Sequence, residues 1–204
     1  RTQLRGSITP PVVAGGRLLV AEKDAHTVRA LSAKSGMPLW DYTAGGRIDS
    51  PPTVYGDVVL FGSADGRVYC LRLEDGAEVW RFLAAPYDRR IVSYCQVESA
   101  WPVHGSVLVQ RDQTLEEPRD VAYVTAGRTS FLDGGIRVYA LDLATGEVLH
   151  ESLLEGPHED PFTVQGKAGY GDGAKSDILT SDGGDVFLFQ ERFTSDLKRV
   201  PAAM

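Results

Sequence analysis

The sequence predicts an all-β fold built from repeated units of four short antiparallel strands. A glycine stands four residues before a tryptophan at Gly36 and Trp40, and the same pattern returns at Gly76 and Trp80. Apolar runs of about four to six residues alternate with turns rich in glycine and aspartate, as in strands joined by hairpins. No window has the apolar spacing of an amphipathic helix, so we expect little helix.

The first unit spans residues 8–48 and the second spans 49–83. Each begins with a proline pair and continues through four apolar runs, which read VVAG, RLLVAE, VRALSA and PLWDYTA in the first unit and TVYG, DVVLFGS, VYCLRL and EVWRFLA in the second. The shift that places Trp40 on Trp80 also places Val28 on Val68. Four strands in about 40 residues are typical of one blade of a β-propeller.

The third unit, residues 84–156, is longer than the first two. Its Gly146 aligns with Gly76, and the interval between these two glycines is much longer than that between Gly36 and Gly76. The additional residues fall between the expected strands, where insertions are tolerated and binding surfaces are often built. They lie in segments 84–105, 111–120 and 128–135.

The remaining chain predicts a loop and an incomplete blade. Residues 157–176 are rich in glycine and polar side chains, which indicates an exposed loop. Residues 177–204 begin like a blade but contain no further glycine–tryptophan pattern, so we predict about three and a half blades. Open edges at both ends of such an arc invite pairing with further strands. We expect these partners to be further blades of a longer chain, with a second copy as the alternative.

The repeat resembles the PQQ-like (quinoprotein-type) β-propeller family, whose blades carry the pattern A-x-D-x-x-T-G-x-x-x-W. Here the pattern reads ALSAKSGMPLW in 30–40, CLRLEDGAEVW in 70–80 and ALDLATGEVLH in 140–150. The resemblance covers residues 8–156 well and 177–189 weakly. It implies a bacterial extracytoplasmic protein, periplasmic or secreted. The family includes alcohol dehydrogenases as well as assembly scaffolds.

The resemblance also implies a structural role for the repeated pattern. In the family the glycine lies in the turn between the third and fourth strands of a blade, and the tryptophan stacks on the turn of a neighbouring blade. An aromatic side chain of this size removes about 150–250 Å² from water. His150 stands where the third tryptophan is expected, and we interpret it as a relaxed docking position, with a pH-sensitive or ligand-binding role as the alternative. We expect structural docking by Gly36, Trp40, Gly76, Trp80, Asp142 and Gly146.

Dehydrogenases of the family hold their quinone on a tryptophan, under a disulfide between adjacent cysteines, with a calcium ion bound by Glu, Asn and Asp. This sequence has two cysteines that are not adjacent, Cys70 and Cys95, and no asparagine. We therefore expect no catalytic residue, no metal site and no cofactor, PQQ included, in these residues. The apolar surroundings of Cys70 favour a buried free thiol, with a bridge to Cys95 as the alternative.

Polar and aromatic side chains concentrate in the inserted segments of the third unit. Charged groups beside an exposed aromatic ring suit recognition of a ligand or a partner. The alternative is that segment 84–105 only spans a wide gap between blades, with its tryptophan covering the edge of the core. The predicted surface consists of Arg89, Arg90, Glu98, Trp101, His104, Arg128 and Asp133.

Charge and hydropathy narrow the function. A formal net charge of −7 argues against a nucleic-acid partner, and no apolar run is long enough to span a membrane. We expect a non-catalytic module, a scaffold that binds protein or carbohydrate within a larger or oligomeric extracytoplasmic protein. The competing hypothesis is the propeller part of a quinoprotein-type oxidoreductase or of a multidomain enzyme.

Overall fold

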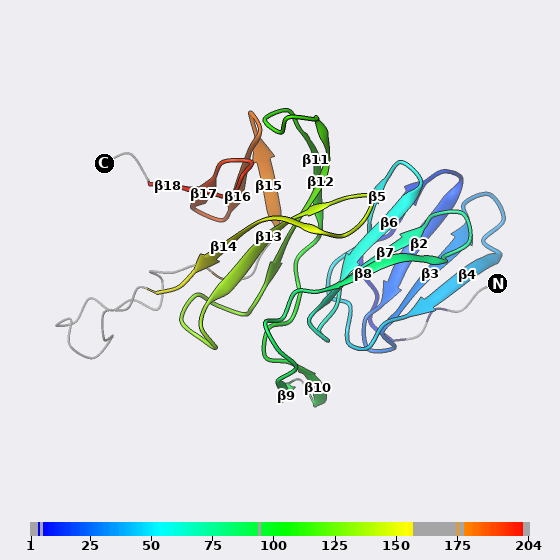
Figure 1. Ribbon diagram of the computed structural model, residues 1–204. Coiled ribbons are helices and arrows are strands. Elements are labelled where there is room, and N and C mark those ends of the chain that lie inside the picture. The colour runs from blue at the N-terminus through cyan, green and yellow to red at the C-terminus, as the bar shows by residue number, and fades with distance from the viewer. Residues whose placement is uncertain (1–3, 5, 94, 157–174, 176–177, 202–204) are drawn as a thin grey trace.

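The protein is described by a computed structural model that covers residues 4, 6–93, 95–156, 175 and 178–201. These residues form four antiparallel four-stranded sheets and one two-stranded hairpin (Figure 1). In every four-stranded sheet the strands lie side by side in chain order. The fold is a β-propeller of four-stranded antiparallel blades, as the sequence predicts.

The strands of each sheet follow the order of the repeat. Sheet 1 consists of β1 (Val12–Ala14), β2 (Arg17–Glu22), β3 (Thr27–Ser32) and β4 (Pro38–Thr43), and sheet 2 of β5 (Thr53–Tyr55), β6 (Val58–Gly62), β7 (Arg67–Arg72) and β8 (Glu78–Leu83). Sheet 3 consists of β11 (Leu108–Asp112), β12 (Arg119–Ala126), β13 (Ile136–Asp142) and β14 (Val148–Leu154). Sheet 4 consists of β15 (Leu179–Asp182), β16 (Asp185–Leu188), β17 (Glu191–Phe193) and β18 (Arg199–Val200).

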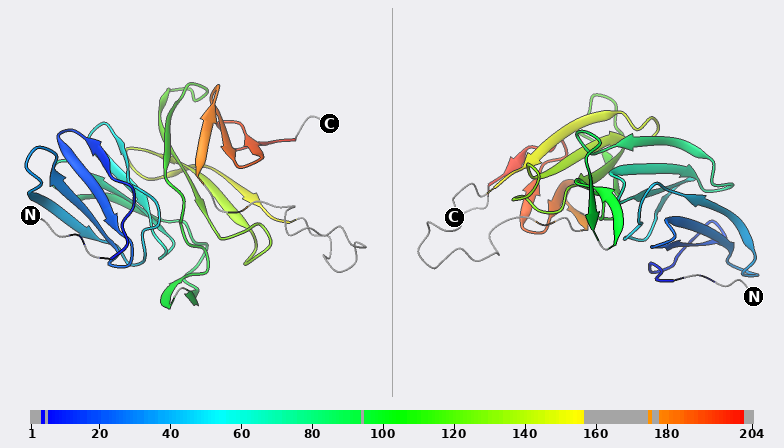
Figure 2. Two further views of the ribbon diagram at one scale, coloured as in Figure 1. Left: turned by 180° about the vertical axis from the view of Figure 1, so that it is seen from behind. Right: turned by 90° about the horizontal axis from the view of Figure 1, so that it is seen from below.

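Consecutive sheets pack face to face, and Figure 2 shows them following one another around the molecule. The central strands are apolar on both faces because a neighbouring sheet covers each face. In β6, Val59 and Phe61 belong to the cluster with sheet 1, whereas Leu60 belongs to the cluster with sheet 3. This alternation follows from the two-residue period of a strand. The third cluster joins sheets 3 and 4 and contains the buried Tyr123 and Phe193.

The loops lie at two opposite ends of the strands. The connection end carries the turns between the second and third strands of each sheet and the segments that lead from one sheet to the next. The turn end carries the turns between the first and second strands and between the third and fourth strands. Because consecutive sheets pack face to face, the loops of adjacent sheets lie beside one another at both ends.

Sheet 4 differs from the sequence prediction. The sequence predicted half of a blade in 177–204, whereas the structure has four strands there. The last two, β17 and β18, have only three and two residues. They read ERF and RV, and such short, charged segments give no strand signal and no glycine–tryptophan pattern. The predicted loop 157–176 lies outside the described residues except for Lys175.

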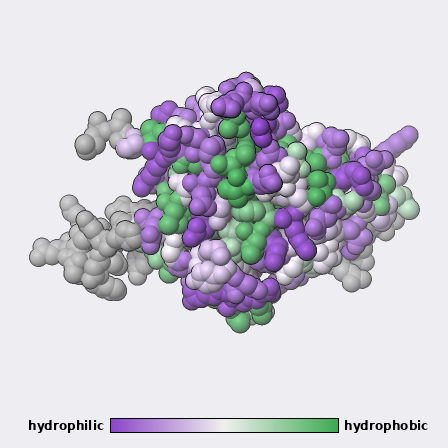
Figure 3. Space-filling view, in the orientation of Figure 1, coloured by the Kyte–Doolittle hydropathy of each residue, from purple (hydrophilic) through white to green (hydrophobic). Residues whose placement is uncertain are grey.

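A second difference lies in the segment between sheets 2 and 3. It contains a hairpin of β9 (Arg90–Ser93) and β10 (Gln96–Ser99), where the sequence predicted a plain connection. Val92 and Val97 are paired across the hairpin and are 78% and 56% exposed. The hairpin lies at the bottom of Figure 1, where Figure 3 shows a small green patch below hydrophilic side chains.

Cys70 and Cys95 are both free thiols, the first buried and the second exposed. In the part of the chain that the structure describes, there is no helix long and apolar enough to cross a membrane.

Candidate binding surface at the connection end

Four of the seven predicted surface residues meet in one cluster, which we call the connection cluster: Arg89, Trp101, Arg128 and Asp133. Two belong to the segment between sheets 2 and 3, and two belong to the loop between β12 and β13. The Asp133 carboxylate accepts from Arg89 Nη1 at 3.0 Å and from Arg128 Nη2 at 2.5 Å. Asp133 has φ of 56°, a left-handed conformation that aspartate tolerates better than most residues. Asp133 thus joins the two segments through contacts with Trp101 and Arg89, which lie 32 and 44 residues away in sequence.

The aromatic part of the cluster is rigid. The Trp101 ring N–H donates to the backbone carbonyl of Asp133 at 2.8 Å, and the residue is 3% exposed. The Tyr87 ring lies edge-on to that of Trp101, with ring centres 4.6 Å apart and an angle of 69°. Tyr87 itself is 57% exposed. Trp101 is therefore a buried support, and Tyr87 is the aromatic ring that a partner can reach.

The surface around the cluster combines positive charge with apolar area. The Arg89 side chain is 52% exposed and that of Arg128 is 29% exposed. Phe131 and Leu132, in the same loop as Asp133, are 49% and 50% exposed. One carboxylate neutralises only one of two guanidinium groups, so the cluster retains a positive charge. Exposed aromatic and arginine side chains on a fixed backbone are the usual composition of a protein-binding patch.

Glu98 and His104 belong to a second network, which sequence analysis did not foresee. His104 Nδ1 lies 2.7 Å from Asp49 Oδ2, and Arg47 donates to both oxygens of Asp49 at 2.8 and 3.1 Å. Arg47 Nη2 also lies 3.7 Å from Glu98 Oε2. Burial raises the pKa of Asp49, but hydrogen bonds from His104 and Arg47 outweigh burial and hold it far below its usual value.

Glu98 is the unusual member of this network. It is 3% exposed, and neither of its carboxylate oxygens has a hydrogen-bond partner among the described residues. Its carboxylate forms an ion pair with Arg47, whose Nη2 lies 3.7 Å from Oε2. Arg47 and Asp49 lie in the short connection between sheets 1 and 2, where nothing in the sequence marks them as a site.

Arg90 stands apart from both groups. It pairs with Asp88 at 3.0 Å, and both side chains are at least half exposed, at 50% and 69%. A pair this exposed contributes little to stability. The predicted surface is therefore divided into the connection cluster, the Glu98–His104 network and an isolated arginine on the hairpin.

The tryptophans of the repeat contact the next sheet. Trp40 donates its ring N–H to the carbonyl of Leu73 at 3.0 Å, and Trp80 donates to that of Leu143 at 2.9 Å. A Cβ atom added to Gly76 would lie 2.6 Å from the Trp40 ring, so the indole rests directly on the glycine. The same construction at Gly146 gives 2.7 Å to the Trp80 ring.

Gly36 and Asp142 contribute to their own turns. A Cβ atom on Gly36 would meet no described atom within 4 Å, and the φ of this residue is +70°. Asp142 accepts from the backbone N–H groups of Ala144 and Thr145 at 2.9 and 3.0 Å. Ser32 and Arg72 take this position in the first two sheets.

The sheet 4 turn that corresponds to the turns of Gly76 and Gly146 contains no glycine. In sheet 4 the corresponding turn has Leu197 at φ 60°, and this leucine is 2% exposed. The turns correspond because Thr194 N–H donates to Lys198 O as Arg72 N–H donates to Ala77 O. Leu197 belongs to the apolar cluster between sheets 3 and 4. His150 Nε2 is buried without a hydrogen-bond partner among the described residues.

Comparisons with known proteins agree with this fold. A family model described as outer membrane protein assembly factor BamB matches residues 1–160. A DNA damage-responsive serine/threonine-protein kinase of Deinococcus radiodurans, RqkA, is 37% identical over 79 residues, 38% of this chain and 12% of the kinase.

Solved propeller structures are similar to this fold. The crystal structure of BamB from Moraxella catarrhalis is similar with a TM-score of 0.59 and 17% identity, over 93% of this chain and 49% of that one. Quinohemoprotein alcohol dehydrogenase from Comamonas testosteroni gives a TM-score of 0.62 at 16% identity, over 97% of this chain and 34% of that one. At such identities the likeness shows the fold alone. The chain spans at most about half the length of these proteins.

Proposed function

Because the chain belongs to the PQQ_2 family, described as outer membrane protein assembly factor BamB, we propose that it is a non-catalytic propeller module that acts as a binding scaffold in the bacterial periplasm or outside the cell. It does so as part of a larger or oligomeric protein. Its partner is a protein or a carbohydrate, and the connection cluster is the surface that binds it. The observation that carries the proposal is this cluster, which contains the half-exposed Arg89 and lies beside the exposed Tyr87 and Phe131.

The tryptophans support a scaffold over a quinoprotein. A quinone of the family type needs the open face of a tryptophan ring. Here the rings of Trp40 and Trp80 rest on glycines of the next sheet, and Trp101 is 3% exposed. These are the three tryptophans of the chain. One face of the Trp40 ring and one face of the Trp80 ring are thus covered by protein, and Trp101 is buried, which favours structural roles over quinone binding.

The ends of the arc support a larger assembly. Val12 packs in the cluster between sheets 1 and 2, so Val13, the next residue of the strand, points to the other face of sheet 1. Val13 is 64% exposed there. An apolar residue at this position suits a further sheet packed on sheet 1, from the same longer chain or from a second copy.

A site-specific photo-crosslinker tests the binding surface. We would place it at Tyr87 in the full-length protein in its native cell and compare it with one at Val79, which is 49% exposed on the outer strand β8. The proposal predicts a discrete crosslinked product from position 87 that is absent at position 79. The product should weaken when Asp133→Asn removes the support of the cluster. Equal products at both positions, or none at position 87, would contradict it.

Dye reduction tests the competing enzyme hypothesis. The purified protein is incubated with PQQ and calcium, and reduction of an artificial electron acceptor is followed after addition of ethanol. We expect no reduction above the rate without protein. Dye reduction that depends on both protein and alcohol would contradict the scaffold proposal and support a quinoprotein-type oxidoreductase.

A further inference from the structure

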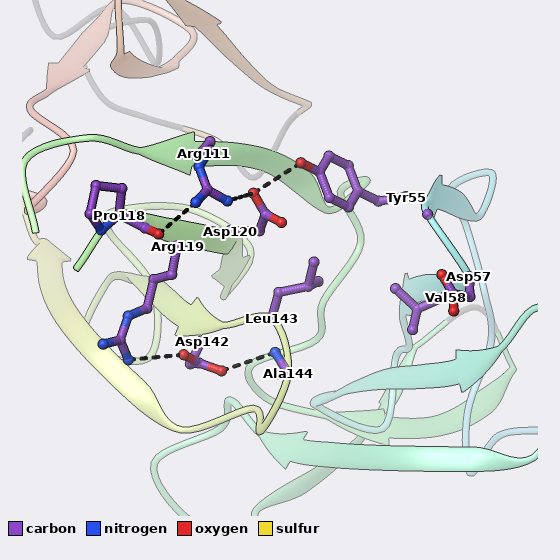
Figure 4. Close-up of a pocket in the computed structure, with 11 residues that line it drawn as sticks. Tyr55, Asp57, Val58, Arg111, Pro118, Arg119, Asp120, Asp142, Leu143 and Ala144 are labelled. Carbon is purple, nitrogen blue, oxygen red and sulfur yellow. Dashed lines mark hydrogen bonds and ion pairs between the residues drawn. The ribbon is translucent and has the colours of Figure 1, made fainter.

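A pocket of about 520 Å³ lies between sheets 2 and 3 at the turn end of the strands (Figure 4). Sheet 2 contributes Gly56, Asp57 and Val58, which form the turn before β6 and its first residue. Sheet 3 contributes Leu143 and Ala144 from the turn after β13, together with polar residues of β11 and β12. None of these residues takes part in the connection cluster, which lies at the other end of the strands.

The equivalent cleft between sheets 1 and 2 is occupied by an arginine of the chain itself. Arg17 Nη1 donates to the carbonyl of Gly15 at 2.8 Å, and Nη2 donates to the carbonyl of Glu74 at 3.2 Å. One guanidinium group thus joins the first turn of sheet 1 to the last turn of sheet 2. Arginine suits this task because its planar group carries five N–H donors in fixed directions.

Strand register shows which residue replaces Arg17 one sheet later. Ala14 pairs with Arg17 across β1 and β2, and Tyr55 pairs with Val58 across β5 and β6. Val58 therefore stands at the position of Arg17, and Gly56 stands at that of Gly15. Valine is too short to cross the cleft, so the cleft between sheets 2 and 3 stays open as the pocket.

The far wall of the pocket corresponds in the same way. Leu73 and Leu143 both accept a tryptophan ring N–H, at 3.0 and 2.9 Å, so the next residues, Glu74 and Ala144, are equivalent. Where Arg17 binds the Glu74 carbonyl, no side chain of the described residues donates to the carbonyl of Ala144 or to that of Gly56. The pocket therefore presents two backbone acceptors in the arrangement that holds a guanidinium in the neighbouring cleft.

The charges in the pocket favour a cation on the side of sheet 2. Asp57 is exposed at the mouth of the pocket, at the position where sheet 1 has Gly16. The two arginines of the pocket are already paired, Arg111 with Asp120 at 3.3 Å and Arg119 with Asp142 at 3.3 Å. Figure 4 shows both arginines on the side of the pocket away from Asp57 and Val58.

We propose that this pocket binds a guanidinium group, presented as an arginine side chain by a partner polypeptide. The group donates to the carbonyls of Gly56 and Ala144 and pairs with the Asp57 carboxylate. The three methylene groups of the arginine lie against Val58 and Leu143, as long charged side chains do along apolar surface. This site is independent of the connection cluster, so either one can fail without the other.

An NMR titration tests the proposal. The ¹⁵N-labelled full chain is titrated with the capped tripeptide acetyl-Gly-Arg-Gly-amide and, as a matched control, with the citrulline tripeptide, which has the same shape without the charge. We expect saturable shifts of the Asp57 and Ala144 amides with the arginine peptide and at least tenfold weaker binding of the citrulline peptide. The Trp101 ring signal should not move.

Two variants sharpen the test. Val58→Arg should fill the pocket with the guanidinium of the chain itself and abolish the shifts, while the rest of the spectrum stays dispersed. Asp57→Asn changes one exposed side chain without altering the packing and should weaken arginine binding several-fold even if Val58→Arg fails to fold. Equal affinity for the arginine and citrulline peptides, or unchanged affinity in the folded Val58→Arg or the Asp57→Asn variant, would overturn the proposal.

Discussion

Alanine substitutions at the three motif glycines separate backbone strain from tryptophan packing. Gly36, Gly76 and Gly146 have almost the same φ, +70°, +73° and +74°, so each Gly→Ala change imposes the same left-handed conformation on alanine. That conformation costs an L-residue about 1–2 kcal/mol. The surroundings differ, because a Cβ atom meets nothing within 4 Å at Gly36 but meets a tryptophan ring at the other two positions. Gly36 is therefore an internal control for the other two.

The added methyl group cannot be accommodated cheaply at Gly76 or Gly146. It would lie 2.6 Å from the Trp40 ring and 2.7 Å from the Trp80 ring. Each ring is fixed by its N–H bond to a carbonyl of the same turn, at 3.0 and 2.9 Å. Forcing such a group into a packed contact costs about 1–3 kcal/mol. We expect Gly36→Ala to lower the free energy of unfolding by about 1–2 kcal/mol and the other two by about 2–5 kcal/mol.

Urea unfolding followed by far-ultraviolet circular dichroism measures the difference. Free energies are compared from the transition midpoints at a common slope. Equal destabilisation by Gly36→Ala, Gly76→Ala and Gly146→Ala would refute a role of tryptophan packing at these glycines. In that case the tryptophans would contribute nothing at these glycines beyond the strain of the turn.

The Asp49 network, the thiols and the connection cluster each give a further prediction. The pKa of Asp49 is lowered in the folded state. The stability that the ionised Asp49 carboxylate contributes is therefore fully present above the usual pKa of 3.8 and is lost as pH falls through the lower folded value. Asp49→Asn should flatten the decline, below about pH 4, of the free energy of unfolding measured in urea. Burial raises the pKa of Cys70 to about 12, so Ellman's reagent at pH 8 should label one thiol per folded chain, Cys95, and labelling of both would contradict the structure. Asp133→Asn leaves two guanidinium groups facing each other, and calorimetry should show the melting temperature lowered by about 2–4 °C, the effect of about 1 kcal/mol in a protein of this size.

Much of the fold could be predicted from the sequence because its determinants are local. Strands such as β6 and β7 are continuous apolar runs between glycine turns, and a two-residue period decides which neighbour each side chain meets. The turn glycines and tryptophans recur with the repeat. Sheet 4 was underestimated because β17 and β18 are too short and too charged to form a pattern.

The sites depend on information that is not local. Asp49 and His104 lie 55 residues apart and meet because the connections of successive sheets converge at one end of the strands. The pocket between sheets 2 and 3 could not be predicted from the sequence repeat, because the strand register differs from the repeat by one position. The repeat interval that aligns the two tryptophans also aligns Arg17 with Asp57, whereas the strand pairing makes Val58 its counterpart. Only the pairing shows that an arginine is replaced by a shorter side chain.

The solution mass of the protein isolated from its native cell tests the central claim most directly. We propose that this four-sheet arc works as a non-catalytic scaffold within a larger or oligomeric protein. Light scattering coupled to size exclusion should then give a mass well above the 22.1 kDa of this chain, from a longer polypeptide or from two copies. A native species of 22.1 kDa that unfolds in one cooperative transition would contradict it.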